Sequence, residues 1–189
     1  MGEASVTPSV LVVDDEEEVA DVYALHLEAW YDVAVAYGGE AALDAVDETT
    51  DVVLLDRRMP DLSGDEVLAR IREQELGCVV VMVTAVDPEL NILEMEFDDY
   101  LSKPLDGDTL REAIEQHVGR ETADPRVAEF FQVLSKLEVL EDSTTGADPE
   151  DDPEFKRLKR RAVELREALV EEVEEFDDLV AAFEDVSRT

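Results

Sequence analysis

The chain has 189 residues, enough for one well-buried domain and a smaller addition. Its 51 Asp and Glu residues against 16 Lys and Arg residues give a formal net charge of −35. This charge argues against a general affinity for nucleic acid, because an acidic surface repels phosphate. Hydrophobic residues make up 45% of the chain, which excludes an acidic disordered protein.

The strong acidity predicts a protein that works in concentrated salt, where repulsion between surface carboxylates is screened within roughly 3 Å at 1 M. The alternative is an ordinary solvated acidic surface. Cys78 stands alone, so no disulfide can form within the chain, and a reducing compartment fits. Because no charged leader with an apolar core begins the chain and no apolar run reaches membrane-spanning length, we expect a cytoplasmic protein without membrane contact.

Short apolar runs and helical patterns alternate over residues 1–120. In chain order, strands are expected at residues 10–13, 32–36, 52–55, 78–83 and 99–101. Helices are expected at residues 16–30, 40–46, 65–73, over a short stretch that starts at Asp87-Pro88, and at 108–118. Within the first helix, the apolar positions that predict the buried face are Val19, Val22, Leu25 and Ala29. Five such alternations predict an α/β fold with a doubly wound, five-stranded parallel sheet.

Polar side chains follow each of the apolar strands that we expect in the middle of this sheet. They are Asp14, Asp15, Asp56, Thr84 and Lys103. Open α/β folds place their sites at the carboxyl ends of their strands, so we expect these side chains to meet there. Three crowded carboxylates repel one another unless one holds a proton or a cation bridges them, and Mg²⁺ favours carboxylates, waters and phosphate oxygens.

Asp56 is the candidate for the reacting group. It ends the run Val52–Leu55, which reads as a strand buried on both faces. With Mg²⁺ bound, its carboxylate can attack an activated phosphorus and form an aspartyl phosphate. Lys103 would pair with one phosphoryl oxygen, and the hydroxyl of Thr84 would hydrogen-bond another. Taken singly, each of the other polar residues could equally be a helix cap or a solvated loop residue.

Four motifs in the same order complete this pattern. They are Val12-Val13-Asp14-Asp15, Asp56-x-x-Met59-Pro60-x-x-x-Gly64, Val83-Thr84-Ala85 and Asp98-Asp99-Tyr100-Leu101-Ser102-Lys103-Pro104. Residues 1–120 therefore resemble the receiver domain of two-component response regulators. The resemblance implies that a sensor histidine kinase phosphorylates Asp56, and that the chain is not an enzyme beyond its own phosphorylation and dephosphorylation.

The same resemblance implies roles for the neighbouring residues. Mg²⁺ would be held by Asp14, Asp15, Asp56 and the backbone carbonyl of Arg58. The phosphoryl group would be bound by Thr84, Ala85 and Lys103. Thr84 and Tyr100 would form the family's switch pair, in which the hydroxyl moves to the phosphoryl group and the ring turns inward. A cis peptide is implied between Lys103 and Pro104.

The segment between Thr84 and Lys103 departs from the receiver pattern, since it is shorter than usual. We therefore expect a short fourth helix, which puts in doubt the common dimer face of receivers that is built on that helix. Arg58 and Val86 stand where receivers control access of the attacking water, and this pair predicts slow self-hydrolysis of the phosphoryl group.

Residues 124–186 are expected to form an all-α helical hairpin. Asp124-Pro125 begins a helix over residues 126–141, and Asp152-Pro153 begins a long helix over residues 154–184. The tail resembles the HalX domain that follows receivers in halophilic archaea. The likeness rests on Phe130-Phe131-x-x-Leu134-Ser135-Lys136 and Phe176-x-x-Leu179-x-x-x-Phe183.

The long helix would outrun its partner and leave apolar residues uncovered. Its bases, Lys156, Arg157, Lys159, Arg160, Arg161 and Arg166, stand before its acids, which dominate residues 167–185. This order opposes the helix dipole, and two antiparallel copies would match plus against minus. We therefore predict a homodimer through the long C-terminal helix.

Two other functions remain as alternatives. The first is DNA binding through the bases of residues 156–161, although no helix-turn-helix spacing is evident. The second is an aspartate-nucleophile phosphatase, but phosphatases that resemble haloacid dehalogenases carry Asp-x-Asp on the first strand. We expect His26 and His117 to be ordinary structural or surface residues, and Trp30 and Phe97 to pack in the core or at its rim.

Overall fold

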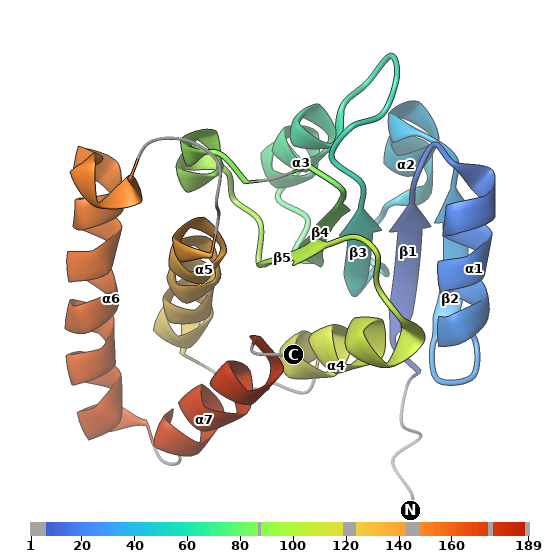
Figure 1. Cartoon of the computed structure of the whole chain (residues 1–189). Coiled ribbons are helices and arrows are strands. Elements are labelled where there is room, and N and C mark those ends of the chain that lie inside the picture. Colours follow the sequence, from blue (N-terminus) through green and yellow to red (C-terminus); the bar gives the residue numbers. More distant parts are fainter. Residues whose placement is uncertain (1–6, 87, 119–123, 143–147, 174–175, 188–189) are drawn as a thin grey trace, which may run out of the picture.

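The computed structural model describes residues 7–86, 88–118, 124–142, 148–173 and 176–187. Its centre is a five-stranded sheet in the order β2-β1-β3-β4-β5, with all neighbouring strands parallel (Figure 1). The strands are β1 Ser9–Val13, β2 Asp32–Ala36, β3 Val52–Leu55, β4 Val79–Thr84 and β5 Asp99–Ser102. The predicted α/β fold and its doubly wound parallel sheet are confirmed.

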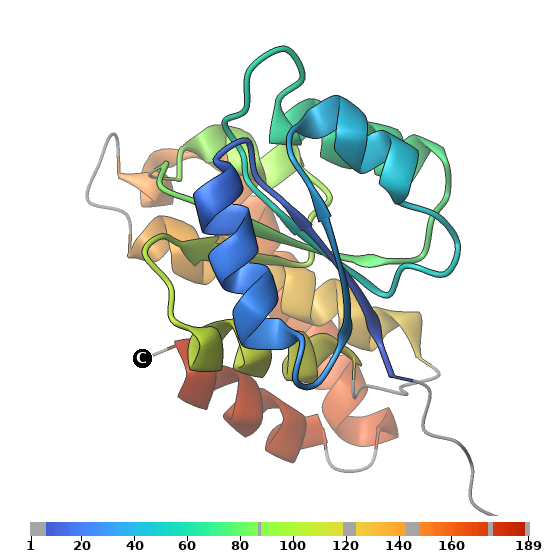
Figure 2. The same cartoon turned by 90° about the vertical axis from the view of Figure 1, so that its right-hand side faces the viewer.

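Alternate residues of each strand point to opposite faces of the sheet, and each face is covered by helices (Figure 2). Val10 and Val12 of β1 belong to the core under α1 Glu17–Leu27 and α4 Gly107–Val118. Leu11 and Val13 belong to the larger core under α2 Gly39–Ala45 and α3 Gly64–Glu73. A sheet buried on both sides explains why its strands read as unbroken apolar runs.

The predicted buried face of α1 is wrong. Val22 and Leu25 are 50% and 71% exposed, and Ala29 lies beyond the end of the helix. The buried residues are instead Ala20, Tyr23, Ala24 and Leu27. Two small alanines let the helix approach the sheet closely, so the larger aliphatic residues do not mark the inner face.

The short fourth helix is the 3₁₀ helix η1, Leu90–Glu94. Its N-cap is Glu89, so the predicted start at Asp87-Pro88 is wrong, although Asp87 itself lies outside the described residues. The C-terminal helix α5, Pro125–Glu141, contacts both η1 and β5. Phe130 and Phe131 of α5 belong to the same apolar core as α2 and α3. A helix of the tail thus covers the part of the sheet beside the short η1 (Figure 1).

The predicted helical hairpin is confirmed in α5 and α6, Pro153–Glu172, which pack together. Asp124 and Asp152 cap these two helices as expected. Between them lies the short 3₁₀ helix η2, Pro149–Asp151.

A single helix over residues 154–184 is wrong. The helix α6 ends at Glu172, Val173 has an extended backbone, and a separate helix α7, Phe176–Ser187, follows. The break lets α7 turn back against α4, while the ring of Phe176 packs 5.2 Å from that of Phe130. The apolar residues that seemed to need a partner are therefore buried in the chain itself. Among the described residues, no helix combines the length and hydropathy that crossing a bilayer requires.

Candidate functional site

Three carboxylates converge at the carboxyl edge of the sheet. Val13 of β1 pairs with Leu55 of β3, so the residues that follow them, Asp14 and Asp56, leave the sheet side by side. One ligand oxygen from each of Asp14, Asp15 and Asp56 can be chosen so that all three lie within 4.8 Å of one another. Asp14 and Asp56 are buried, whereas Asp15 is exposed. Oxygen donors of this kind at this spacing fit a hard divalent cation.

Lys103 joins this cluster from β5. Its ammonium lies 2.5 Å from Oδ2 of Asp14 and 3.3 Å from Oδ1 of Asp56. Its backbone N–H donates to the carbonyl of Thr84 over 2.9 Å, and the peptide between Lys103 and Pro104 is cis. One ammonium among three carboxylates leaves the group with excess negative charge, which a cation would offset.

Burial raises the pKa of Asp56, and the neighbouring Asp14 and Asp15 raise it further, while Lys103 opposes them. Burial works against the ammonium of Lys103, but its hydrogen bond with Asp14 and its attraction to Asp56 prevail and raise its pKa. The lysine therefore stays charged at neutral pH, and the carboxylate of Asp56 is the group whose ionisation the site makes costly.

The turn after β3 fixes the carboxylate of Asp56. The backbone N–H of Arg58 donates to Oδ2 of Asp56 over 3.1 Å, so this peptide lies beside the cluster. Gly64 donates its N–H to the carbonyl of Arg57 over 2.8 Å. A Cβ at Gly64 would lie 2.1 Å from the carbonyl oxygen of Asp56, so this close approach requires glycine.

Arg57 is a buried residue of the site that the sequence did not single out. Its guanidinium makes two hydrogen bonds to the carboxylate of Asp65, of 2.9 and 3.2 Å, and it also interacts with the side chain of Tyr100. The signal that could have found it is the arginine-to-aspartate spacing across the turn, since Asp65 lies in the first turn of α3.

Thr84 and Tyr100 meet at the backbone of Val86. The Thr84 hydroxyl is buried and accepts a hydrogen bond from the Val86 N–H over 3.2 Å. The Tyr100 hydroxyl donates to the Val86 carbonyl over 2.8 Å, and its ring is turned inward. Ala85 lies between them and is exposed. All the predicted site residues thus gather at one edge of the sheet.

Comparison with known proteins agrees with this geometry. The family model described as the response regulator receiver domain matches residues 10–115. The chain belongs to this family. The HalX domain model matches residues 119–187, so the receiver is followed by a HalX domain. Both resemblances inferred from the motifs are confirmed, and the match gives the fold its name.

Two curated relatives carry the receiver likeness further. A putative transcriptional regulator of Haloferax volcanii is 47% identical over 133 residues, which cover 70% of this chain and 23% of that protein. The alkaline phosphatase synthesis transcriptional regulatory protein PhoP of Bacillus subtilis is 41% identical over 100 residues, which cover 50% of this chain and 42% of that protein. The chain therefore spans less than half the length of either relative.

A solved receiver shares the arrangement. The response regulator TrrA of Thermotoga maritima, determined in complex with Mg²⁺ and BeF, has a TM-score of 0.51 and 29% sequence identity, and the likeness covers 59% of this chain and 99% of that one. Its title names magnesium bound to that protein. In this receiver, the acidic cluster of Asp14, Asp15 and Asp56 offers the matching donor set.

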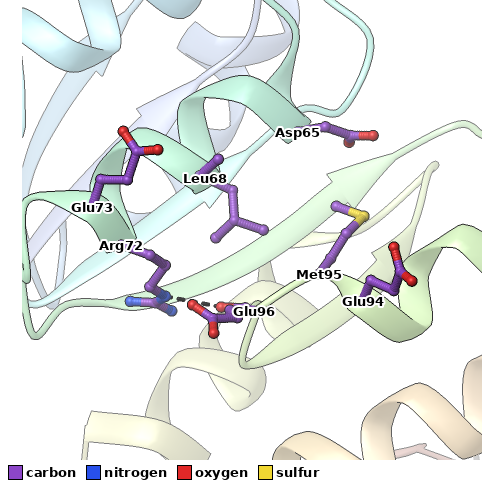
Figure 3. Close-up of a pocket in the computed structure, with 8 residues that line it drawn as sticks. Asp65, Leu68, Arg72, Glu73, Glu94, Met95 and Glu96 are labelled. Carbon is purple, nitrogen blue, oxygen red and sulfur yellow. Dashed lines mark hydrogen bonds between the residues drawn. The ribbon is translucent and has the colours of Figure 1, made fainter.

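Two hollows lie near the receiver's turns. One, of about 410 Å³, is lined by both Arg58 and Val86, the pair expected to control access of water. The other, of about 450 Å³, lies between α3 and the segment after η1, with Leu68 and Met95 among its lining residues (Figure 3). None of the clustered carboxylates lines the second hollow.

Four residues without an assigned role are also placed. Phe97 is fully buried, and Trp30 lies at the surface under the guanidinium of Arg111, 5.1 Å from the ring centroid. His26 is exposed, while Nε2 of His117 lies 3.2 Å from Oδ2 of Asp99. Among these, His117 is therefore a partner of β5 rather than a plain surface residue.

Proposed function

We propose that this chain is a two-component response regulator that accepts a phosphoryl group on Asp56 from a sensor histidine kinase. The observation that carries the proposal is the convergence of the three carboxylates with Lys103 at the edge of a receiver sheet. It is a phosphoacceptor and not an enzyme that turns over a separate substrate.

In the transfer step, a carboxylate oxygen of Asp56 forms a bond to phosphorus while the bond from phosphorus to the donor's imidazole nitrogen breaks. The residues that would hold Mg²⁺ are Asp14, Asp15 and Asp56, with the backbone carbonyl of Arg58. Bound there, the ion would neutralise negative charge that gathers on the phosphoryl oxygens.

The other side chains act on the same group. The ammonium of Lys103 already lies 3.3 Å from Asp56, so it can pair with an oxygen of the phosphoryl group once this is bound. The hydroxyl of Thr84 exchanges its hydrogen bond from Val86 for one that it donates to a phosphoryl oxygen. Because Tyr100 is bonded to the same Val86, this exchange reaches the aromatic ring.

We further propose that the signal passes from Tyr100 to the HalX helix α5. The ring of Tyr100 lies 5.7 Å from that of Phe97, and the ammonium of Lys136 on α5 lies 5.5 Å from the Phe97 ring. Lys136 also donates to the carbonyl of Leu93 in η1 over 3.1 Å. Burial lowers the pKa of Lys136, so this contact is sensitive to any change in its surroundings.

Two further hydrogen bonds attach α5 to the start of β5. Gln132 donates to Asp98 over 2.6 Å, and Ser135 donates to Asp99 over 2.9 Å. Tyr100 directly follows these two aspartates in the strand. A movement of β5 or η1 therefore changes the seat of α5, and this provides a route from the acidic cluster to the C-terminal helices.

The phosphoacceptor role is tested by incubating the protein with acetyl phosphate and Mg²⁺. We expect a mass increase of one phosphoryl group, which hydroxylamine removes and which the Asp56→Asn variant does not show. The matched control is Asp44→Asn, an exposed aspartate on α2, which should react as the parent does. A protein that stays unmodified, or one modified equally in Asp56→Asn, would contradict the proposal.

The relay is tested separately by hydrogen exchange with beryllofluoride and Mg²⁺. We expect altered protection of the amides of α5 on addition of the phosphoryl mimic, and a smaller change in Lys136→Met. A response limited to the loops around Asp56 would refute the relay and leave the phosphoacceptor role intact.

A second candidate is control of transcription through DNA binding by the C-terminal helices. The names of both curated relatives favour it, and Lys156, Arg157 and Arg160 form an exposed basic group on α6. The net charge of −35 opposes it. Salt-dependent binding of duplex DNA by the full chain would support this candidate.

A further inference from the structure

The helix α6 presents an uncovered face to solvent at one edge of the molecule (Figure 1). Its opposite face is buried against α5 through residues such as Phe155 and Leu165. Along the uncovered face runs a stripe of exposed residues three or four positions apart, which comprises Lys156, Arg160, Val163, Glu167, Val170 and Glu171. Val163 is 57% exposed and Val170 is 47% exposed, which is unusual for valines on a packed helix.

The charges beside this stripe are already paired within the chain. The ion pairs are Arg157–Glu154 at 2.5 Å, Lys159–Glu141 at 2.8 Å and Arg161–Glu129 at 2.7 Å. By contrast, no ion pair with any described residue is found for the four charges of the stripe, Lys156, Arg160, Glu167 and Glu171. Only the outward charges of this face therefore remain without a partner in the described part of the chain.

The order of these four charges does not serve the helix itself. The two bases lie toward the N-terminus of α6 and the two acids toward its C-terminus. Because the helix dipole favours acids at the N-terminus and bases at the C-terminus, the order lowers the stability of the isolated helix. It needs an explanation outside the helix.

The positions of the charges have two-fold symmetry. Lys156 and Glu171 lie equally far along the helix from the midpoint between Val163 and Glu164, and so do Arg160 and Glu167. If a second α6 lies antiparallel across this midpoint, every base of one copy faces an acid of the other. A contact of this kind closes on itself, because each copy offers the same surface.

We infer that the uncovered face of α6 binds the same face of a second copy of this chain, with the two helices antiparallel. Lys156 pairs with Glu171 of the other copy, Arg160 pairs with Glu167 of the other copy, and the two Val163 side chains meet near the symmetry axis. Glu164 also lies near the axis, where its charge is offset by Arg161 of its own helix at 3.7 Å.

The size of the contact sets its strength. A helix of 20 residues is about 30 Å long, and one pair of such helices forms a small interface. The association is therefore weak and depends on protein concentration. Each copy also carries a charge of −35, and 1 M salt limits the resulting long-range repulsion to roughly 3 Å, while contacts at the interface remain. The dimer forms best in concentrated salt.

The inference goes beyond the proposed phosphoacceptor function and does not depend on Asp56. It is tested on the full chain by sedimentation velocity in 1 M KCl, at protein concentrations from about 10 μM to about 1 mM. We expect reversible monomer–dimer exchange. Arg160→Glu and Glu167→Arg should each weaken it about tenfold, because two symmetric pairs are lost and like charges oppose each other.

The double variant, Arg160→Glu with Glu167→Arg, restores opposite charges across the interface and should return the dissociation constant to within about threefold of the parent. The control Arg70→Glu alters an exposed arginine of α3 and should leave association unchanged. Circular dichroism establishes that each variant is folded. A parent that stays monomeric at 1 mM overturns the inference, as does a double variant no better than the single ones. A monomeric parent whose duplex DNA binding is lost only in Arg160→Glu would overturn it in favour of nucleic acid.

Discussion

The ammonium of Lys103 bridges Asp14 and Asp56, at 2.5 Å from the first carboxylate and 3.3 Å from the second. All three side chains are mostly buried, so the lysine is the internal counter-charge of the site. In Lys103→Met the two carboxylates lose this partner, and we expect a loss of about 3 kcal/mol in unfolding free energy in the absence of divalent ions. Thermal melts at pH 7 measure this loss.

Magnesium should restore part of the stability of Lys103→Met, because a cation then takes the place of the ammonium. The rise in melting temperature on adding Mg²⁺ should therefore be larger in the variant than in the parent. Equal rises in the two proteins would show that Lys103 and the metal do not act on the same charges.

Replacing Asp56 by asparagine should stabilise the metal-free protein. Since burial and Asp14 raise the pKa of Asp56, its contribution to stability is full below the pKa of an unfolded aspartate, about 3.9, and is lost as the pH rises through the folded value. At pH 7 we expect Asp56→Asn to melt about 2–4 °C above the parent. The difference should vanish near pH 3. A variant that melts below the parent at pH 7 would contradict this account.

Substitution at Gly64 should damage the site through the backbone. A Cβ there would lie 2.1 Å from the Asp56 carbonyl, so Gly64→Ala must displace the turn that holds the carboxylate. We expect a loss of about 3 kcal/mol and slower phosphorylation by acetyl phosphate. Gly77→Ala is the control, since nothing lies within 4 Å of a Cβ at that position. Equal behaviour of the two variants would disprove the close-packing argument.

The receiver and the HalX helices should unfold as one unit. Phe130 of α5 is 2% exposed and belongs to the apolar core that also contains Leu55 and Phe97 of the receiver. We expect Phe130→Ala to lower the unfolding free energy by about 3–5 kcal/mol while chemical denaturation stays a single transition. Leu25→Ala on α1, where the side chain is 71% exposed, should change it by less than about 0.5 kcal/mol. Separate loss of the C-terminal helices, with the receiver unchanged, would argue against a shared core.

Salt should stabilise the whole chain. With a net charge of −35, long-range repulsion among carboxylates opposes the compact state, and added ions screen it. We expect the melting temperature to rise steadily from dilute buffer to about 2 M KCl. Sodium chloride at the same ionic strength should act similarly if screening is the cause. A constant melting temperature would refute the interpretation of the acidity as an adaptation to salt.

The amino-acid sequence by itself determined the receiver fold and the members of its site. Val52–Leu55 could only be a strand buried on both faces, and the polar residues that end such strands must meet at one edge of a parallel sheet. Gly64 was likewise predictable as part of a turn motif. These features depend on local pattern and on strand direction, which a sequence states directly.

Tertiary structure decided the features that depend on close packing. The inner face of α1 is set by Ala20 and Ala24, which the pattern of larger aliphatics concealed. The end of α6 at Glu172 is set by the contacts that α7 makes with α4 and that Phe176 makes with Phe130. The docking of α5 beside η1 unites the two domains in one core. A sequence shows which side chains must be buried, but only the assembled chain shows which surface is near enough to bury them.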